Sequence, residues 1–237
     1  MSLANYFEGD PAFTAEQETE QLRLTQAIRT LIDHSVQLNA PLATLTQLAN
    51  QLEAAAAVME PFSTVRPLAS HNKLFKPEEA SWSSPYSPVV GRCNPLAAPM
   101  SIVLREGKAI GSVIFGEAYE GPPTCVHGGI VALTWDHVMA IANMAIDARG
   151  PTAWLHVEYR KPTPLHKHLR FEAWIEKLEG KKIFVRGRCY VEGGNGEVIT
   201  QATGLFINTV IKNIGVDVAQ IRQGFTRDAP AHHHTAD

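Results

Sequence analysis

The residues best placed to do chemistry lie in one stretch of the chain, PPTCVHGGIVALTWDHVMAIANM at positions 122–144. Prolines and a histidine precede two adjacent glycines, after which the sequence favours an uninterrupted helix. The first turn of a helix presents free N–H groups at the positive end of its dipole, where an anion or a polarised carbonyl oxygen can bind. Gly128 could supply such a backbone donor, and His127 a side-chain donor. In the alternative interpretation, Gly128 and Gly129 only allow the helix to pack closely, and His127 only caps it.

A carboxylate in the apolar body of the same helix points to a second chemical group. The positions at helical spacing around Asp136 are apolar, and they include Ala132, Leu133, Met139 and Ala140. A charge on such a face needs a partner or a purpose. Asp136 is therefore a candidate base or nucleophile.

The spacing of these two groups bears on how they could act together. Asp136 follows Gly128 by eight residues, which corresponds to roughly 12 Å along a helix axis. The N–H groups and the carboxylate of one helix are therefore too far apart to act easily on one carbon atom. A second copy related by a two-fold axis could supply the missing group. If both groups act on one substrate, we expect a homo-oligomer with the active site between subunits.

The strand patterns outline the domain that must position these groups. Apolar runs predict two strands, at 100–106 and 109–116, joined by a turn at Gly107 and Lys108. Four more strands are predicted after the helix of 127–147, and they cover 152–160, 168–179, 181–192 and 197–209. Turns rich in Gly and Asn join the last three strands, which implies antiparallel pairing. We therefore expect an α+β domain over 95–212, with one long helix against a five- or six-stranded antiparallel sheet.

The rest of the chain is expected to be an extension of that domain. Residues 1–60 predict a helical hairpin, with Thr14 and Gln17 as a potential capping box at its start. Seven of the fifteen prolines fall in or just after residues 61–94, so this segment is interpreted as a Pro-rich connector. Residues 213–237 are interpreted as a C-terminal tail.

Composition argues against several classes of protein. With 45% hydrophobic residues, 19% charged residues and a formal net charge of −3, the chain resembles a globular protein with a core. Its 21 Lys and Arg are outnumbered and dispersed, which argues against nucleic-acid binding. No apolar stretch is expected to approach the roughly 20 residues of a membrane span. The sequence starts without a basic signal region, and its three cysteines have neither disulfide nor zinc spacing. We therefore expect a cytoplasmic protein without a bound metal.

Several motifs resemble those of a known family. VHGGIVALTWDHVMA, at 126–140, is similar to the motif of hotdog-fold thioesterases of the PaaI-like group, especially the acyl-CoA thioesterase branch that includes the mammalian mitochondrial enzymes. TAWLHVEYRKPTPL, LEGKKIFVRGRCY and ATGLFINT continue the resemblance in the same order. It covers residues 95–210 and leaves out the N-terminal helices and the connector. It implies a hotdog fold, in which an antiparallel sheet wraps a central helix and subunits pair their sheets, with an acyl-CoA substrate and no cofactor.

The resemblance also implies roles for individual residues. His127 would help to position or polarise the thioester, and the N–H of Gly128 would face its carbonyl oxygen. Asp136 of the opposite subunit would act as nucleophile or as general base for water. Thr152 would help to hold that water, although a β-branched residue that simply begins a strand is an equally good interpretation without the resemblance.

Substrate binding is expected to involve residues next to these groups. Gly129 adjoins the donor glycine, and Arg160 and Lys161 are candidates for the phosphates of CoA. Basic residues at a strand end are, however, more often only solvated.

Other functions stay open at this point. A hotdog domain could bind acyl-CoA without cleaving it, but such a binder gains nothing from the acid Asp136. A hotdog hydratase would need a histidine a few positions after the acid, whereas His137 is adjacent and points elsewhere on a helix. Cys125 lacks a separate base that would activate a thiolate. The G-x-S-x-G motif of serine hydrolases is not found.

Overall fold

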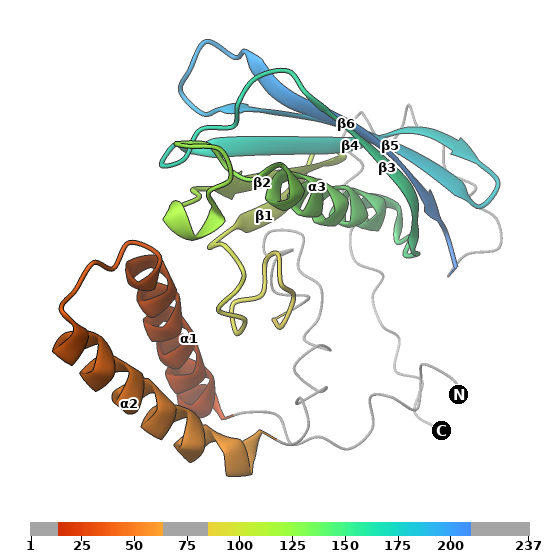
Figure 1. Cartoon of the computed structure of the whole chain (residues 1–237). Coiled ribbons are helices and arrows are strands. Elements are labelled where there is room, and N and C mark those ends of the chain that lie inside the picture. The colour runs from red at the N-terminus through yellow and green to blue at the C-terminus, as the bar shows by residue number, and fades with distance from the viewer. Residues whose placement is uncertain (1–13, 64–84, 210–237) are drawn as a thin grey trace, which may run out of the picture. The chain divides into compact units, whose positions relative to one another are not determined.

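The computed structural model describes residues 14–63 and 85–209 (Figure 1). The chain divides into two compact units. The first contains the N-terminal helices, the segment up to Ala98 and residues 116–118, and the second contains the sheet and its helix. Residues 64–84 of the expected connector and the expected tail at 213–237 lie outside the described residues.

Two helices form where the sequence predicts a helical hairpin: α1 (Ala15–Ser35) and α2 (Leu42–Met59). The expected capping box starts α1, since the Gln17 N–H donates to Thr14 Oγ1 at 3.1 Å and the Thr14 N–H donates to Gln17 Oε1 at 2.9 Å. A single 3₁₀ turn, Glu60–Phe62, follows α2. No residue of α2 is buried, so this apolar helix adds nothing to a core within the described part of the chain.

Arg29 on α1 holds an irregular stretch of the same unit in place. Its guanidinium donates to the backbone oxygens of Ala97 at 3.0 Å, Gly91 at 2.9 Å and Asn94 at 2.8 Å. Carbonyls outside helices and strands need such partners when they are buried, and the five N–H donors of arginine suit several of them at once. Residues 91–97 thus take a defined shape without regular secondary structure.

Six antiparallel strands form one sheet in the described part of the chain, which confirms the predicted α+β class. They are β1 (Ser101–Arg105), β2 (Lys108–Val113), β3 (Thr152–Tyr159), β4 (Leu169–Glu179), β5 (Lys182–Val191) and β6 (Val198–Ile207). Their order in the sheet is β1-β2-β4-β5-β6-β3. Positive φ angles at Glu106 (51°) and Gly107 (69°) close the first hairpin, as tight hairpin turns require. β3 lies at the sheet edge beside β6, and β2 takes the place beside β4.

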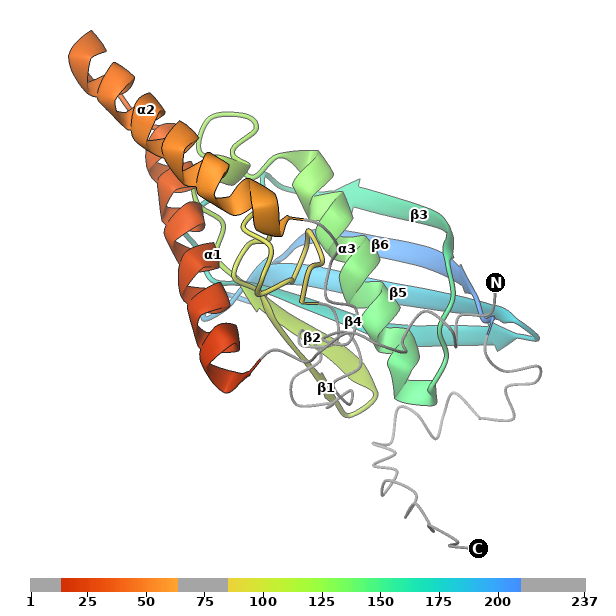
Figure 2. The ribbon, with the colours of Figure 1, turned by 90° about the horizontal axis from the view of Figure 1, so that it is seen from below.

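The predicted long helix is α3 (Gly128–Asn143), which continues into a 3₁₀ turn at Met144–Ile146. Figures 1 and 2 show α3 lying against one face of the sheet. Its Trp135 is fully buried, packs edge-to-face on Phe171 with 4.9 Å between ring centroids, and donates from Nε1 to Thr200 Oγ1 at 3.1 Å. A Cβ on Gly187 of β5 would lie 2.3 Å from the indole Cζ3. The bare glycine therefore provides the space that the indole fills, and this contact fixes the rotation of α3 about its axis.

The apolar character of α3 corrects one expectation from the sequence. Residues Gly128–Ile146 form a helix of 19 residues that is long and apolar enough, by length and composition alone, to cross a membrane. Half of that window is buried inside the protein, and α3 packs on the sheet of its own domain. Both observations fit the core helix of a folded domain, because such a helix is apolar on most of its surface.

The opposite face of the sheet carries a polar network around Glu172. The side chain of Glu172 is 8% exposed, accepts from Tyr190 Oη at 2.6 Å and from Arg188 Nη2 at 2.9 Å. Burial alone would raise the pKa of Glu172, but the hydrogen bonds from Tyr190 and Arg188 outweigh it and lower the pKa. The carboxylate therefore stays charged on this face.

The close packing of Trp135 against Gly187 can be tested by a single methyl group. We expect Gly187→Ala to lower the free energy of unfolding by about 1–3 kcal/mol, because the added Cβ overlaps with the buried indole. Urea denaturation measures this difference. Gly116→Ala is a matched control, since a Cβ there would meet only Asp33 Oδ1 at the ordinary contact distance of 3.5 Å. Equal losses in the two variants would contradict the role of Gly187.

Candidate active site

His127 is the N-cap residue of α3, as one of the two sequence interpretations expected. Its Nδ1 accepts a hydrogen bond from the Gly129 N–H at 2.9 Å. An acceptor Nδ1 places the hydrogen of a neutral imidazole on Nε2. The side chain is exposed, so capping through Nδ1 leaves Nε2–H available as a donor toward a bound molecule. The capping role and the donor role are thus compatible.

Gly128 supplies a free donor at the first position of the helix. Among the described residues its N–H has no hydrogen-bond acceptor, whereas the N–H groups of Ile130 and Val131 donate to the His127 carbonyl oxygen at 2.9 and 3.2 Å. Gly128 itself is half-buried. The N–H of Gly129, by contrast, is occupied by His127. The donor geometry at this helix end therefore consists of the Gly128 N–H and the His127 imidazole.

Asp136 lies on the less buried side of α3 and is oriented by a threonine. It is half-buried, whereas Trp135 and Val138 beside it are fully buried. The hydroxyl of Thr152, the first residue of β3, donates to Asp136 Oδ1 at 2.6 Å. Oδ2 has no donor within the described residues. Thr152 thus fixes the carboxylate and leaves one oxygen free to act.

The two groups stay separate within one chain. α3 is continuous from Gly128 to Asn143, so Asp136 lies roughly 12 Å along the axis from the Gly128 N–H. One chain therefore does not bring the helix end and its own carboxylate onto one carbon atom.

His137, the residue after the carboxylate, does not complete a catalytic pair with it. Its Nε2 is buried and has no hydrogen-bond partner within the described residues. Burial lowers the pKa of His137 from its ordinary value of 6.5 to about 4, although the charge of Asp136 acts in the opposite direction. The imidazole is therefore neutral at physiological pH and faces the interior.

Two residues near the helix end have contacts that the sequence did not indicate. A Cβ on Gly121 would lie 2.7 Å from His127 Cα, so only glycine allows the preceding loop to pack on the histidine. Tyr159, the last residue of β3, donates from its hydroxyl to the Gly128 carbonyl oxygen at 2.7 Å. In the sequence, only the strand alternation pointed to this role of Tyr159, because it places Tyr159 on the same face as Leu155 and Val157.

The remaining candidates lie on the surface. Arg160 Nη2 is 3.4 Å from Glu158 Oε2, and Lys161 forms an ion pair with Glu197. All four side chains are about half exposed. Cys125 is a free, half-buried cysteine, and the structure gives it no additional role.

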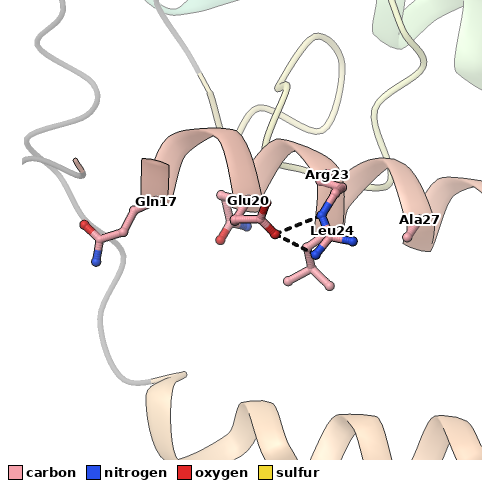
Figure 3. Close-up of a pocket in the computed structure, with 6 residues that line it drawn as sticks. Gln17, Glu20, Arg23, Leu24 and Ala27 are labelled. Carbon is pink, nitrogen blue, oxygen red and sulfur yellow. Dashed lines mark hydrogen bonds and ion pairs between the residues drawn. The ribbon is translucent and has the colours of Figure 1, made fainter. Parts of the chain in front are cut away.

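A hollow of about 510 Å³ runs along α1, lined by Gln17, Glu20, Gln21, Arg23, Leu24 and Ala27 (Figure 3). Its only charged groups, Glu20 and Arg23, form an exposed ion pair at 2.6 Å. None of the candidate catalytic residues lines it. It is therefore not part of the site on α3.

Comparison with known proteins agrees with this architecture. Residues 124–198 match the family model of the thioesterase superfamily. A crystal structure of a thioesterase superfamily protein resembles this chain with a TM-score of 0.68 and 29% sequence identity, over 84% of this chain and 94% of that one. The fold is therefore the hotdog fold, and residues 124–198 resemble the thioesterase superfamily.

Curated relatives are more specific in name. The chain is 33% identical over 93 residues to acyl-coenzyme A thioesterase THEM4 of Xenopus laevis, over 39% of this chain and 41% of that protein. It is 36% identical over 91 residues to the THEM4 protein of Rattus norvegicus, over 37% of each chain. The chain thus matches about two fifths of the length of these relatives.

The lowered pKa of His137 predicts a loss of stability in acid. In the unfolded chain His137 binds a proton near pH 6.5, whereas in the folded protein it does so only near pH 4. The contribution of His137 to the free energy of unfolding is therefore complete above pH 6.5 and is lost as the pH falls toward 4. The difference corresponds to roughly 3 kcal/mol.

Urea unfolding of the wild type and of His137→Gln between pH 7 and pH 4 measures this contribution. The variant should show a flatter dependence of the unfolding free energy on pH. His156→Gln, at a side chain that is 66% exposed, should keep the wild-type slope. Parallel curves for wild type and His137→Gln would contradict the prediction.

Proposed function

We propose that the protein is a thioester hydrolase that converts acyl-CoA and water into a free acid and CoA. One observation carries the proposal: α3 has a Gly128 N–H at its start that no group in residues 14–63 or 85–209 accepts, beside His127, and a carboxylate oriented by Thr152 in its body. The relatives that are described as acyl-coenzyme A thioesterases support the substrate class.

The helix end stabilises the charge that develops during hydrolysis. When an oxygen attacks the thioester carbon, negative charge forms on the carbonyl oxygen. The Gly128 N–H and the His127 Nε2–H are donors for that oxygen. Loss of one such donor typically costs about 2.7–4 kcal/mol of transition-state stabilisation.

Asp136 supplies or activates the attacking oxygen. Its free Oδ2 can take a proton from water, while Thr152 holds Oδ1. The new bond joins the water oxygen to the acyl carbon, the carbon–sulfur bond breaks, and the leaving sulfur takes up a proton as the CoA thiol. A carboxylate near a thioester therefore has a chemical purpose that binding alone would not give it.

The complete site is formed by two protomers. Because the donors and the carboxylate of one helix are roughly 12 Å apart, the Asp136 of a second copy faces the Gly128 and His127 of the first. A two-fold axis then makes two equal sites.

The nucleotide part of CoA binds at the end of β3. Arg160 and Lys161 follow Tyr159 directly, and in the described part of the chain their ion pairs are with exposed carboxylates. Exposed ion pairs contribute about 0–1 kcal/mol, so the phosphates of CoA can replace Glu158 and Glu197 at little cost.

The activity is tested with a panel of substrates from acetyl-CoA to palmitoyl-CoA, together with aromatic acyl-CoAs, by following thiol release. We expect Asp136→Asn to lower kcat by about 10²- to 10⁴-fold, with normal folding because Asn is nearly isosteric. Asp147→Asn is the control, since this exposed residue has φ 54°, a conformation that Asn also tolerates. Acyl-CoA binding without any thiol release by the wild type would instead identify a binding module.

The shared site predicts complementation between two inactive variants. His127→Asn, which keeps an N-cap side chain, and Asp136→Asn are refolded together in equal amounts. Mixed dimers then hold one intact site, so roughly a quarter of the wild-type activity should return. If mixing restores no activity while mixed dimers are detected by mass spectrometry, the two groups belong to separate sites or to one chain.

A further inference from the structure

The peptide unit between Gly128 and Gly129 is held from both sides. Its carbonyl oxygen accepts from Tyr159 Oη at 2.7 Å, and its N–H donates to His127 Nδ1 at 2.9 Å. Tyr159, one peptide group and His127 thus form a continuous chain of hydrogen bonds. The chain ends at the imidazole whose Nε2–H faces outward.

Tyr159 is well placed to make this contact. A Cβ on Gly128 would lie 3.5 Å from the Cε1 and Cζ atoms of the tyrosine ring, so the ring lies against the bare Cα. The residue is 51% exposed, which leaves part of it accessible. Burial raises the pKa of Tyr159, and the hydroxyl therefore stays protonated and able to donate at physiological pH.

A helix that begins with two glycines needs such an external contact. Glycine has more backbone freedom than any other residue, and it weakens a helix by about 0.5–1 kcal/mol relative to alanine. The first N–H groups of a helix also lack partners within the helix. The Gly128–Gly129 peptide would therefore be the most mobile part of the site if nothing outside the helix held it.

We propose that Tyr159 is a positioning residue that orients the His127 imidazole through the Gly128–Gly129 peptide, and with that peptide the adjoining Gly128 N–H. This inference rests on the proposed function for its effect on catalysis. By donating to the Gly128 carbonyl oxygen, Tyr159 polarises the peptide and strengthens its N–H as a donor to Nδ1, because hydrogen bonds in a chain reinforce one another. The bonded Nδ1 keeps the hydrogen on Nε2, where the thioester oxygen binds.

Tyr159→Phe tests the role, since it keeps the ring over Gly128 and removes only the hydroxyl. We expect kcat to fall about 3- to 10-fold with KM unchanged, in line with the loss of one hydrogen bond between neutral groups. Nuclear magnetic resonance supplies a second readout, on the full-length protein without substrate. The ¹⁵N signal of His127 Nδ1 should move toward that of an imidazole nitrogen without a donor, and the Gly129 amide proton signal should move upfield.

Tyr190→Phe is the matched control, because Tyr190 also donates from its hydroxyl, at 2.6 Å, but to Glu172 on the other face of the sheet. It should leave kcat and the His127 signals unchanged. Unchanged His127 and Gly129 signals in Tyr159→Phe would overturn the inference, whatever happens to kcat. Shifted signals with an unchanged kcat would overturn it as well.

The two proposals fail in different ways. A wild-type protein that hydrolyses no acyl-CoA would overturn the proposed function. In that case the His127 and Gly129 signals still decide the structural part of the inference: shifted signals support the hold of Tyr159 on the peptide, and unchanged signals overturn it.

Discussion

The insertion of Trp135 into the space above Gly187 is the contact on which the rest of the domain depends. A helix can rotate on a sheet unless a large side chain meets a matching gap, and close packing makes such a match costly to disturb. The indole is fully buried and also bonded to Thr200. With this rotation fixed, the neighbouring Asp136 lies toward the edge strand β3, where Thr152 binds it.

The strand β3 then contacts α3 beside both candidate catalytic groups. Its first residue, Thr152, binds Asp136, and its last residue, Tyr159, binds Gly128. The helix and the strand run past one another in opposite directions, so that one strand of eight residues contacts both the Asp136 carboxylate and the Gly128 carbonyl oxygen. This arrangement explains how a site with few charged residues keeps a defined geometry.

Much of this architecture could be predicted from the sequence, because hydrophobic periodicity and turn residues are local signals. The six strands, the helix of the domain and the capping box at Thr14 were all indicated, and so was the unusual placement of Asp136. The expectation that no segment has the length and apolar character of a membrane span was wrong for α3, since a buried core helix and a membrane-spanning helix can share the same apolar composition.

The contacts that Tyr159 and Gly121 make with the helix end could not be predicted, because they join distant parts of the chain. The hydrogen bond of Tyr159 joins residues 31 positions apart, and nothing in a single sequence sets the register of β3 against α3. Gly121 is similar: only the close approach of its loop to His127 reveals why it has no side chain. Sequence reasoning therefore pointed to Thr152 and the candidate groups on α3, and it missed the contacts of Tyr159 and Gly121.

The place of β3 at the edge of the sheet has a consequence for how the proposed activity would be lost. An edge strand has a backbone row without neighbours in its own sheet, and such segments open at a lower free energy than the core. Because Thr152 and Tyr159 both belong to this strand, its detachment would release both candidate catalytic groups together, while Trp135 stays buried. The proposed activity would then be lost on warming before the whole domain melts, and a preparation could look native by spectroscopy after that loss.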